Sequence, residues 1–543
     1  MKTRPPLALG VLVVLSLGAQ ALFLASPARP GLPLDDAWTH ATYARSLAAH
    51  GRLTLHPHQP SSAPTSLLWP GLLAALRLVG GGPVLAPALV NLPLQAWLVV
   101  LCWLLARDAG LGGRWAFAAA ASSALLGSLV WLALSGMEAT LFLALGLTAV
   151  WARCRGRHLA AGLLAGLLVL ARPEGLALPL AFALAELPAW RDRSARPGRW
   201  RAWLRLLAPA AVAAAVYLAV QLAAAGRLVP ATYAGRRWLA GEPAAVSLSP
   251  VALWSQLVGF ATAWVAYLFH WVFGTGLLWR LGVPRPEIAG VVLEVVFGLA
   301  AAYGLVAVLW SRAGGAERRA ASPLRLLVLW TLVHDAAYIV LLPVHGHAGR
   351  YQAVHFVLLP LLVALGLERL ARRRTDWVRH LGPAAMALWL VLCLGSTLLW
   401  RTVYRDGVDH LARVHVACGR HIADRLPPDA VVATTDLGAI AYFARRPILH
   451  LGGLVDPETT RALRAGRCVP HIRRRGATHL AVAQHGRADA EPLERLGLLP
   501  PAPDRPALAF LDMWVVFPGH YRLHQGATST ATPAIALYRL DRP

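Results

Sequence analysis

The chain has 543 residues, of which 57% are hydrophobic and only 15% are charged, and its formal net charge is +25. Its apolar residues come in runs as long as a bilayer is thick, which excludes a soluble globular protein. The arginines cluster between these runs, where the positive-inside rule places them in short cytoplasmic loops, so the charge does not indicate nucleic-acid binding.

Residues 7–25 follow Lys2 and Arg4 as the apolar part of a signal peptide would. At about nineteen residues the stretch exceeds a typical signal-peptide core, and many spans follow it, so we expect a retained first helix with a cytoplasmic N-terminus. About eleven transmembrane helices are predicted in all. The further ten lie near 84–106, 115–134, 138–152, 159–171, 174–189, 203–224, 287–311, 325–343, 351–368 and 380–399.

Two apolar stretches depart from this simple pattern. Residues 159–189 are too long for one span, and Arg172-Pro173-Glu174-Gly175 divides them, because proline is favoured at the first helical position. Residues 251–283 are rich in tryptophan, and counting them as a span would put the arginines at 312–325 outside. We therefore interpret 251–283 as an interfacial or re-entrant segment.

The predicted fold is an α-helical polytopic membrane protein with a small C-terminal extracytoplasmic α/β domain. The membrane domain covers 1–400, with a first external loop at 26–83 that carries an amphipathic helix near 37–50 ended by Gly51. The second domain covers 401–543. Its expected strands are 431–434 and 479–482, and its expected helices are 408–425 and 457–475.

The five cysteines show no metal-ligand spacing. Cys418 and Cys468 could pair in an oxidising compartment, a question that the sequence leaves open.

The first external loop holds the richest group of polar residues. Asp35 and Asp36 start a helix, and helical spacing places Asp36, His40 and Tyr43 on one face. One reading is structural, with one acid as N-cap and the other favouring the helix dipole. The other is catalytic, because a carboxylate near the membrane surface can accept the proton of an attacking hydroxyl.

Charged residues at other turns and within spans are further candidates. Glu138 and Arg172 lie at predicted external turns, where Glu138 could favour a helix N-terminus and Arg172 could either snorkel or bind a lipid phosphate. His334 and Asp335 lie inside a predicted span, where ionisable residues are costly and indicate function.

The external turn before residue 351 holds His345, His347 and Arg350. Two histidines without a third ligand are a weak metal signal, so Arg350 is the stronger candidate, as a second phosphate contact. In the C-terminal domain, Asp436 lies in an Asp-x-Gly turn that is interpreted as a packing device. Nucleotide-binding and hydrolase motifs do not occur in the sequence.

The order of several short motifs carries a family resemblance. The motifs are Asp35-Asp36-Ala37, Tyr43-Ala44-Arg45, Thr65-Ser66-Leu67-Leu68-Trp69, Gly136-Met137-Glu138, Arg172-Pro173-Glu174-Gly175, Pro230-Ala231-Thr232-Tyr233, Gly349-Arg350-Tyr351, Asp436-Leu437-Gly438-Ala439-Ile440 and Gly453-Leu454-Val455-Asp456-Pro457. With them the chain resembles the polytopic GT-C glycosyltransferases that use polyprenyl-phosphate sugars. It looks closest to cell-wall arabinofuranosyltransferases and is more distantly similar to aminoarabinose transferase and protein O-mannosyltransferases.

The resemblance implies transfer of a sugar from a polyprenyl-phosphate donor to a cell-envelope hydroxyl, with inversion, at the outer face of the bacterial cytoplasmic membrane. The expected catalytic residues are Asp35, Asp36 and Glu138. The expected substrate-binding residues are His40, Tyr43, Arg45, Arg172, Glu174, Tyr233, His334, Asp335, His347, Arg350 and Tyr351. No cofactor is expected, no metal ligand is assigned, and the need for a divalent metal stays open.

Two alternatives use the same spans. The chain could be a transporter or flippase of lipid-linked glycans, or a non-catalytic subunit of envelope assembly. The 143-residue outer domain and the paired acids of the first loop favour the enzyme, because a transporter requires neither.

Overall fold

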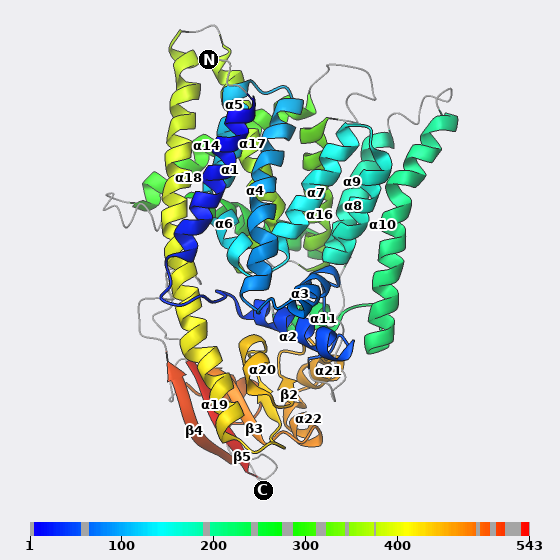
Figure 1. The fold of residues 1–543 in the computed structure, drawn as a ribbon, viewed down its shortest axis with the longest axis vertical. Coiled ribbons are helices and arrows are strands. Elements are labelled where there is room, and N and C mark those ends of the chain that lie inside the picture. Colours follow the sequence, from blue (N-terminus) through cyan, green and yellow to red (C-terminus); the bar gives the residue numbers. More distant parts are fainter. Residues whose placement is uncertain are drawn as a thin grey trace.

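A bundle of apolar helices and a small sheet domain lie at opposite ends of the molecule, with short helices between them (Figure 1). This architecture comes from a computed structural model of the chain. It describes residues 5–55, 64–187, 196–239, 248–273, 286–310, 322–342, 347–373, 376–484, 489–499, 507–515 and 534–541.

Within the described residues, seven helical segments are long and apolar enough to cross a membrane. They lie in α1 (Pro5–Leu24), α4 (Leu85–Asp108), α10 (Arg196–Ala225), α14 (Pro286–Leu309), α16 (Pro323–Leu341), α17 (Ala353–Ala371) and α18 (Asp376–Leu411). The other predicted spans are occupied by the bent pair α5 (Gly113–Leu125) and α6 (Gly127–Leu134) and by the shorter helices α7 (Ala139–Cys154), α8 (His158–Ala171) and α9 (Ala177–Glu186).

The predicted span 115–134 is interrupted rather than straight. Helices α5 and α6 meet at 51°, because Leu126 takes an extended conformation. Backbone groups freed by such a break need partners inside a membrane. Two residues of α18 supply them: Ser396 Oγ accepts the N–H of Gly127 at 3.3 Å, and Thr397 donates its hydroxyl to the carbonyl of Leu125.

The division of residues 159–189 is confirmed. Arg172 is extended, and the 3-10 helix η1 (Pro173–Leu176) starts at the proline before α9. Residues 250–273 form one continuous helix, α12 (Pro250–Phe273). The interfacial or re-entrant placement of 251–283 stays a prediction.

Three helices lie between the bundle and the sheet domain: α2 (Asp35–His50), α3 (Leu68–Leu78) and α11 (Ala231–Leu239) (Figure 1). As predicted, α2 ends at Gly51, whose φ of +64° favours glycine. The indole of Trp38 on α2 packs against the rings of Tyr442 and Phe443, with centroids 5.2 and 5.0 Å away, and so joins α2 to the C-terminal domain.

The C-terminal domain contains a mixed sheet of order β2-β1-β3-β5-β4. The strands β1 and β3 confirm the two predicted strands, whereas β2, β4 and β5 were not predicted. The strands are β1 (Val432–Thr434), β2 (Ile448–His450), β3 (His479–Gln484), β4 (Ala507–Val515) and β5 (Ala534–Asp541). The helices are α19 (Ala417–Arg425), α20 (Gly438–Ala444), α21 (Pro457–Arg464), α22 (Cys468–Arg474) and α23 (Glu491–Arg495).

The two faces of this sheet bury separate cores. Leu480 and Val482 of β3 belong to one core and Ala481 to the other, as strand periodicity requires. Cys468 lies in the first core and Cys418 in the second, and both are free cysteines. The disulfide that the sequence left open is therefore not formed.

Helix α18 connects the two parts of the chain directly. It passes residue 400 without interruption and continues through a π-helical turn, η5 (Ala412–Val416), into α19. The bundle and the sheet domain thus share a helical connection at one side and the α2 contacts at the other.

Candidate active site

Asp35, the first acid of α2, is bound by the C-terminal domain. Its carboxylate accepts the backbone N–H groups of Gly438 at 2.7 Å and Ala439 at 2.8 Å, and it lies 3.4 Å from Nδ1 of His415. A Cβ at Gly438 would collide with the backbone of Asp35, so only glycine permits this approach. The first acid is thus a contact between α2 and α20.

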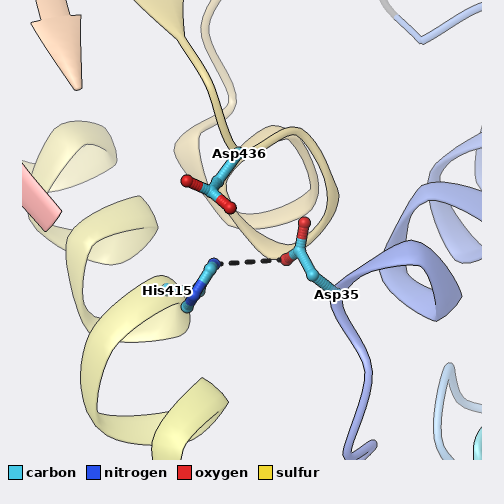
Figure 2. A group of neighbouring side chains, drawn as sticks. All are labelled: Asp35, His415 and Asp436. Atoms are coloured by element: carbon cyan, nitrogen blue, oxygen red, sulfur yellow. Dashed lines mark ion pairs between the residues drawn. The ribbon is translucent and has the colours of Figure 1, made fainter. Parts of the chain in front are cut away.

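Asp35 and Asp436 titrate differently although they are neighbours (Figure 2). Burial would raise the pKa of Asp35, but the nearby His415 ring and the amide of Ala439 lower it. The pKa of Asp436 is raised, because burial and the charges of Asp35 and Asp36 outweigh the attraction of His415. The pKa values of the two neighbouring carboxylates are therefore shifted in opposite directions.

Asp36, the second acid, faces the membrane bundle. Its carboxylate forms ion pairs with Arg350 and, at 3.1 Å, with Arg236. Asp36 lies in the first turn of α2, and Arg236 lies on α11. Arg350 lies on the 3-10 helix η4 (His347–Gln352), which precedes α17. The Asp36 side chain remains 31% exposed, so this pairing leaves the carboxylate accessible to a ligand.

Three arginines share the ring of Tyr351. The guanidinium carbons of Arg172, Arg236 and Arg350 each lie 5.2 Å from its centroid. An aromatic face attracts a cation at this distance. The ring of Tyr338 stacks on Tyr351 with centroids 5.7 Å apart. Positive charge is therefore concentrated at the end of the bundle that faces the sheet domain.

Arg350 has unused donors. The residue is 3% exposed, and its Nε and Nη1 make no hydrogen bond to any part of the chain that the structure describes. Buried donors without partners are costly. Since a guanidinium presents its donors as a fork that fits phosphate and carboxylate, Arg350 can bind an anion in addition to Asp36.

Glu138, Arg172 and Glu174 form a second, buried network. Arg172 donates to Glu174 at 2.5 Å and to Glu138 at 3.2 Å, and Glu138 pairs with His40 at 3.3 Å. Tyr338 donates its hydroxyl to Glu174 at 2.7 Å. Four residues that the sequence analysis selected are thus in contact and neutralise one another's charge, while Glu138 Oε2 and His40 Nδ1 have no hydrogen-bond partner among the described residues.

His334 and Asp335 lie beside this network within α16. Asp335 pairs with His355 of α17 at 3.0 Å and with His334 at 3.6 Å. His334 is fully buried, and its ring nitrogens make no hydrogen bond within the described ranges. The intramembrane acid is therefore paired, as expected for a charge in this environment.

The other predicted binding residues lie in different surroundings. Tyr43 is buried, and Arg45 donates to the carbonyl of Tyr442 at 2.7 Å and stacks on its ring, which makes it a contact to the C-terminal domain. Tyr233 donates its hydroxyl to the carbonyl of Leu341. The side chain of His347 and all of His345 lie outside the described residues.

Sequence reasoning missed Arg236, His415 and Tyr338 and gave Asp436 only a packing role. Arg236 is one of 52 basic residues. Its one distinguishing signal is its position three residues after Tyr233, in a motif that the sequence analysis had already selected. His415 carried no local signal, because its partners are about 380 positions away in the sequence or on another element.

Comparisons with known proteins support the fold. Residues 403–538 match a family described as a domain of unknown function (DUF8728). No curated protein matches the chain. Two crystal structures of ArnT from Cupriavidus metallidurans, one bound to undecaprenyl phosphate and one in the apo state, are similar over 97% of this chain and 98% of theirs. Their TM-scores are 0.53 and 0.52, at 15% sequence identity. ArnT is a GT-C aminoarabinose transferase, so the predicted GT-C-like fold with its small C-terminal α/β domain is confirmed.

The buried network predicts a large stability difference between two arginine substitutions. Arg172→Leu leaves Glu138 and Glu174 without their shared cation, so we expect the free energy of unfolding to fall by about 3–5 kcal/mol. Arg155→Leu removes a half-exposed pair with Asp108 and should cost about 0–1 kcal/mol. Thermal unfolding of both variants in detergent checks this, and equal midpoints would contradict the network.

Proposed function

We propose that the chain is a membrane glycosyltransferase that moves a sugar from a polyprenyl-phosphate donor to an acceptor hydroxyl. The observation that carries the proposal is the accessible Asp36 carboxylate paired with Arg350, whose two other donor nitrogens are buried and unused among the described residues. The ArnT-like fold and the undecaprenyl phosphate bound to ArnT support it.

The anion-binding part of the reaction is assigned to Arg350 and Arg236. Both pair with Asp36 and both lie over Tyr351, so they form one positive surface. A lipid phosphate bound by Nε and Nη1 of Arg350 would lie next to the carboxylate that shares this arginine. Arg172 is assigned a supporting role, because Glu138 and Glu174 already neutralise it.

Asp36 is the proposed base. Both oxygens of Asp35 already accept backbone N–H groups, and the carboxylate lies against His415, so a proton transfer there would disrupt the domain contact. Glu138 is 5% exposed and holds Arg172 and His40, which makes it a positioning residue. Of the three acids expected to be catalytic, Asp36 combines exposure with a neighbouring anion site.

The reaction is a single displacement. The acceptor oxygen forms a bond to the anomeric carbon while its proton passes to Asp36. The bond from the anomeric carbon to the phosphate oxygen breaks, and the lipid phosphate leaves with the electron pair. Arg350 and Arg236 stabilise the negative charge that develops on that phosphate. One displacement inverts the configuration of the sugar.

The reaction is further proposed to occur on the outer side of the bacterial cytoplasmic membrane, on the envelope face that carries the sheet domain. The support is the clustering of arginines in loops at the other ends of the helices.

Activity measurements distinguish the two neighbouring acids. Asp36→Asn removes the base, so transfer of radiolabelled sugar from a panel of synthetic polyprenyl-phosphate donors should fall about 10²- to 10⁴-fold with unchanged folding. Asp35→Asn keeps Asp36 and should act mainly on thermal stability. Full activity in Asp36→Asn would overturn the assignment. Transport of a lipid-linked glycan by purified protein that turns over no donor would favour the flippase alternative.

Labelling of introduced cysteines tests the orientation, because the native cysteines other than Cys154 are buried. In a Cys154→Ser background, Glu458→Cys on α21 should react with a membrane-impermeant thiol reagent in intact spheroplasts. Arg155→Cys, at the opposite ends of the helices, should react only after permeabilisation. The two parent side chains are similarly exposed, at 55% and 49%. The reverse pattern would place the site in the cytoplasm.

A further inference from the structure

Three potential metal ligands meet where α2 joins the C-terminal domain. Asp35, His415 and Asp436 each offer one ligand atom, and these atoms all lie within 4.8 Å of one another. Figure 2 shows the three side chains directed toward one point, from the start of α2, from the π-helical turn η5 and from the loop after β1. Segments near the two ends of the chain thus supply one nitrogen and two oxygen donors.

The distance between His415 and Asp35 suits a small divalent cation. Zn²⁺ binds imidazole nitrogen and carboxylate oxygen at about 2.0–2.2 Å, so ligand atoms around one ion lie about 3–4 Å apart. His415 Nδ1 lies 3.4 Å from Oδ1 of Asp35, within this range. That distance is long for a strong charged hydrogen bond but suitable for two ligands of one metal.

The ring nitrogen of His415 that faces the carboxylates lacks a hydrogen-bond partner among the described residues. His415 is only 7% exposed, and its Nδ1, which is directed at the carboxylates, makes no hydrogen bond to any described residue. Desolvating a ring nitrogen without a partner costs free energy. A metal ion between the ring and the carboxylates would supply that partner.

The carboxylates are oriented from outside, as metal ligands usually are. Gly438 and Ala439 donate their backbone N–H groups to Asp35, and Thr435 donates its hydroxyl to Asp436 at 3.2 Å. Such outer hydrogen bonds fix ligand orientation in metal sites.

The charge of the group favours a cation. Asp35 and Asp436 are close together, and Asp36, which is itself paired with Arg236 and Arg350, lies nearby. Two partly buried carboxylates this close together are stabilised by a bound proton or by a metal ion. A measurement of metal binding distinguishes a shared proton from a bound metal ion.

We propose that Asp35, His415 and Asp436 bind one divalent transition-metal ion of the Zn²⁺ type, which clamps α2 to the C-terminal domain. Mixed nitrogen and oxygen donors suit Zn²⁺, and three protein ligands leave the fourth tetrahedral position to water. The site does not depend on the transfer reaction proposed above, because its readout is bound metal.

Metal content of the full-length protein in detergent tests the proposal. The protein is stripped with a chelator, equilibrated with Zn²⁺ and analysed by mass spectrometry for bound metal. Wild type should hold one equivalent more than His415→Ala or Asp436→Asn. Loss of an outer hydrogen bond alone weakens metal sites about 10- to 100-fold, so loss of a ligand should weaken Zn²⁺ binding by at least about 100-fold.

The matched controls are His421→Ala and Asp512→Asn. They change the same residue types in the same domain, at a more exposed pair whose atoms are 3.9 Å apart. Both controls should keep the wild-type metal content. Equal metal content in wild type and in the ligand variants would overturn the site, since any bound Zn²⁺ would then lie elsewhere on the chain.

A measurement on wild type alone covers the case in which the ligand variants do not fold. A ligand that binds only the folded state raises the unfolding midpoint. The midpoint of the stripped protein should therefore rise with Zn²⁺ and fall again with chelator. An unchanged midpoint at saturating Zn²⁺ would overturn the clamp and leave a proton on Asp436 as the balancing charge.

Discussion

The buried guanidinium of Arg350 is the constraint around which the end of the membrane bundle is organised. A cation that is 3% exposed is stable only beside an anion, and Asp36 provides one from a different part of the chain. This pairing places α2 across the end of the bundle and brings Arg236 of α11 to the same carboxylate. The donors that Arg350 does not use on Asp36 are the proposed contacts of the lipid phosphate.

The two adjacent acids of α2 contact different parts of the molecule, because successive residues of a helix point about 100° apart. Asp36 faces the bundle and its arginines, while Asp35 faces α20 and His415. Helix α2 therefore couples the C-terminal domain to the membrane domain through neighbouring side chains. In the proposed reaction, the C-terminal domain acts by fixing the helix that carries the base.

Much of the fold follows from sequence, whereas most of the site does not. Hydropathy and the Arg172-Pro173 break predict where the helices lie, because burial in lipid acts on each helix separately. Asp36 and Arg350 could be selected singly as charged residues at turns. Their pairing, the arginines around Tyr351 and the approach of His415 to Asp35 depend on contacts between distant segments. No local pattern encodes such contacts, and the strands β4 and β5 were missed for the same reason.

The most direct test of this account is equilibrium binding of undecaprenyl phosphate to the purified protein. We expect wild type to bind it and Arg350→Gln to bind it at least about 10-fold more weakly, because one charge-assisted hydrogen bond contributes about 1.5–3 kcal/mol. Arg372→Gln, which changes an arginine with a 66% exposed side chain just beyond the end of α17, should bind like wild type. Equal affinity of all three proteins would contradict the assignment of Arg350 to the lipid phosphate.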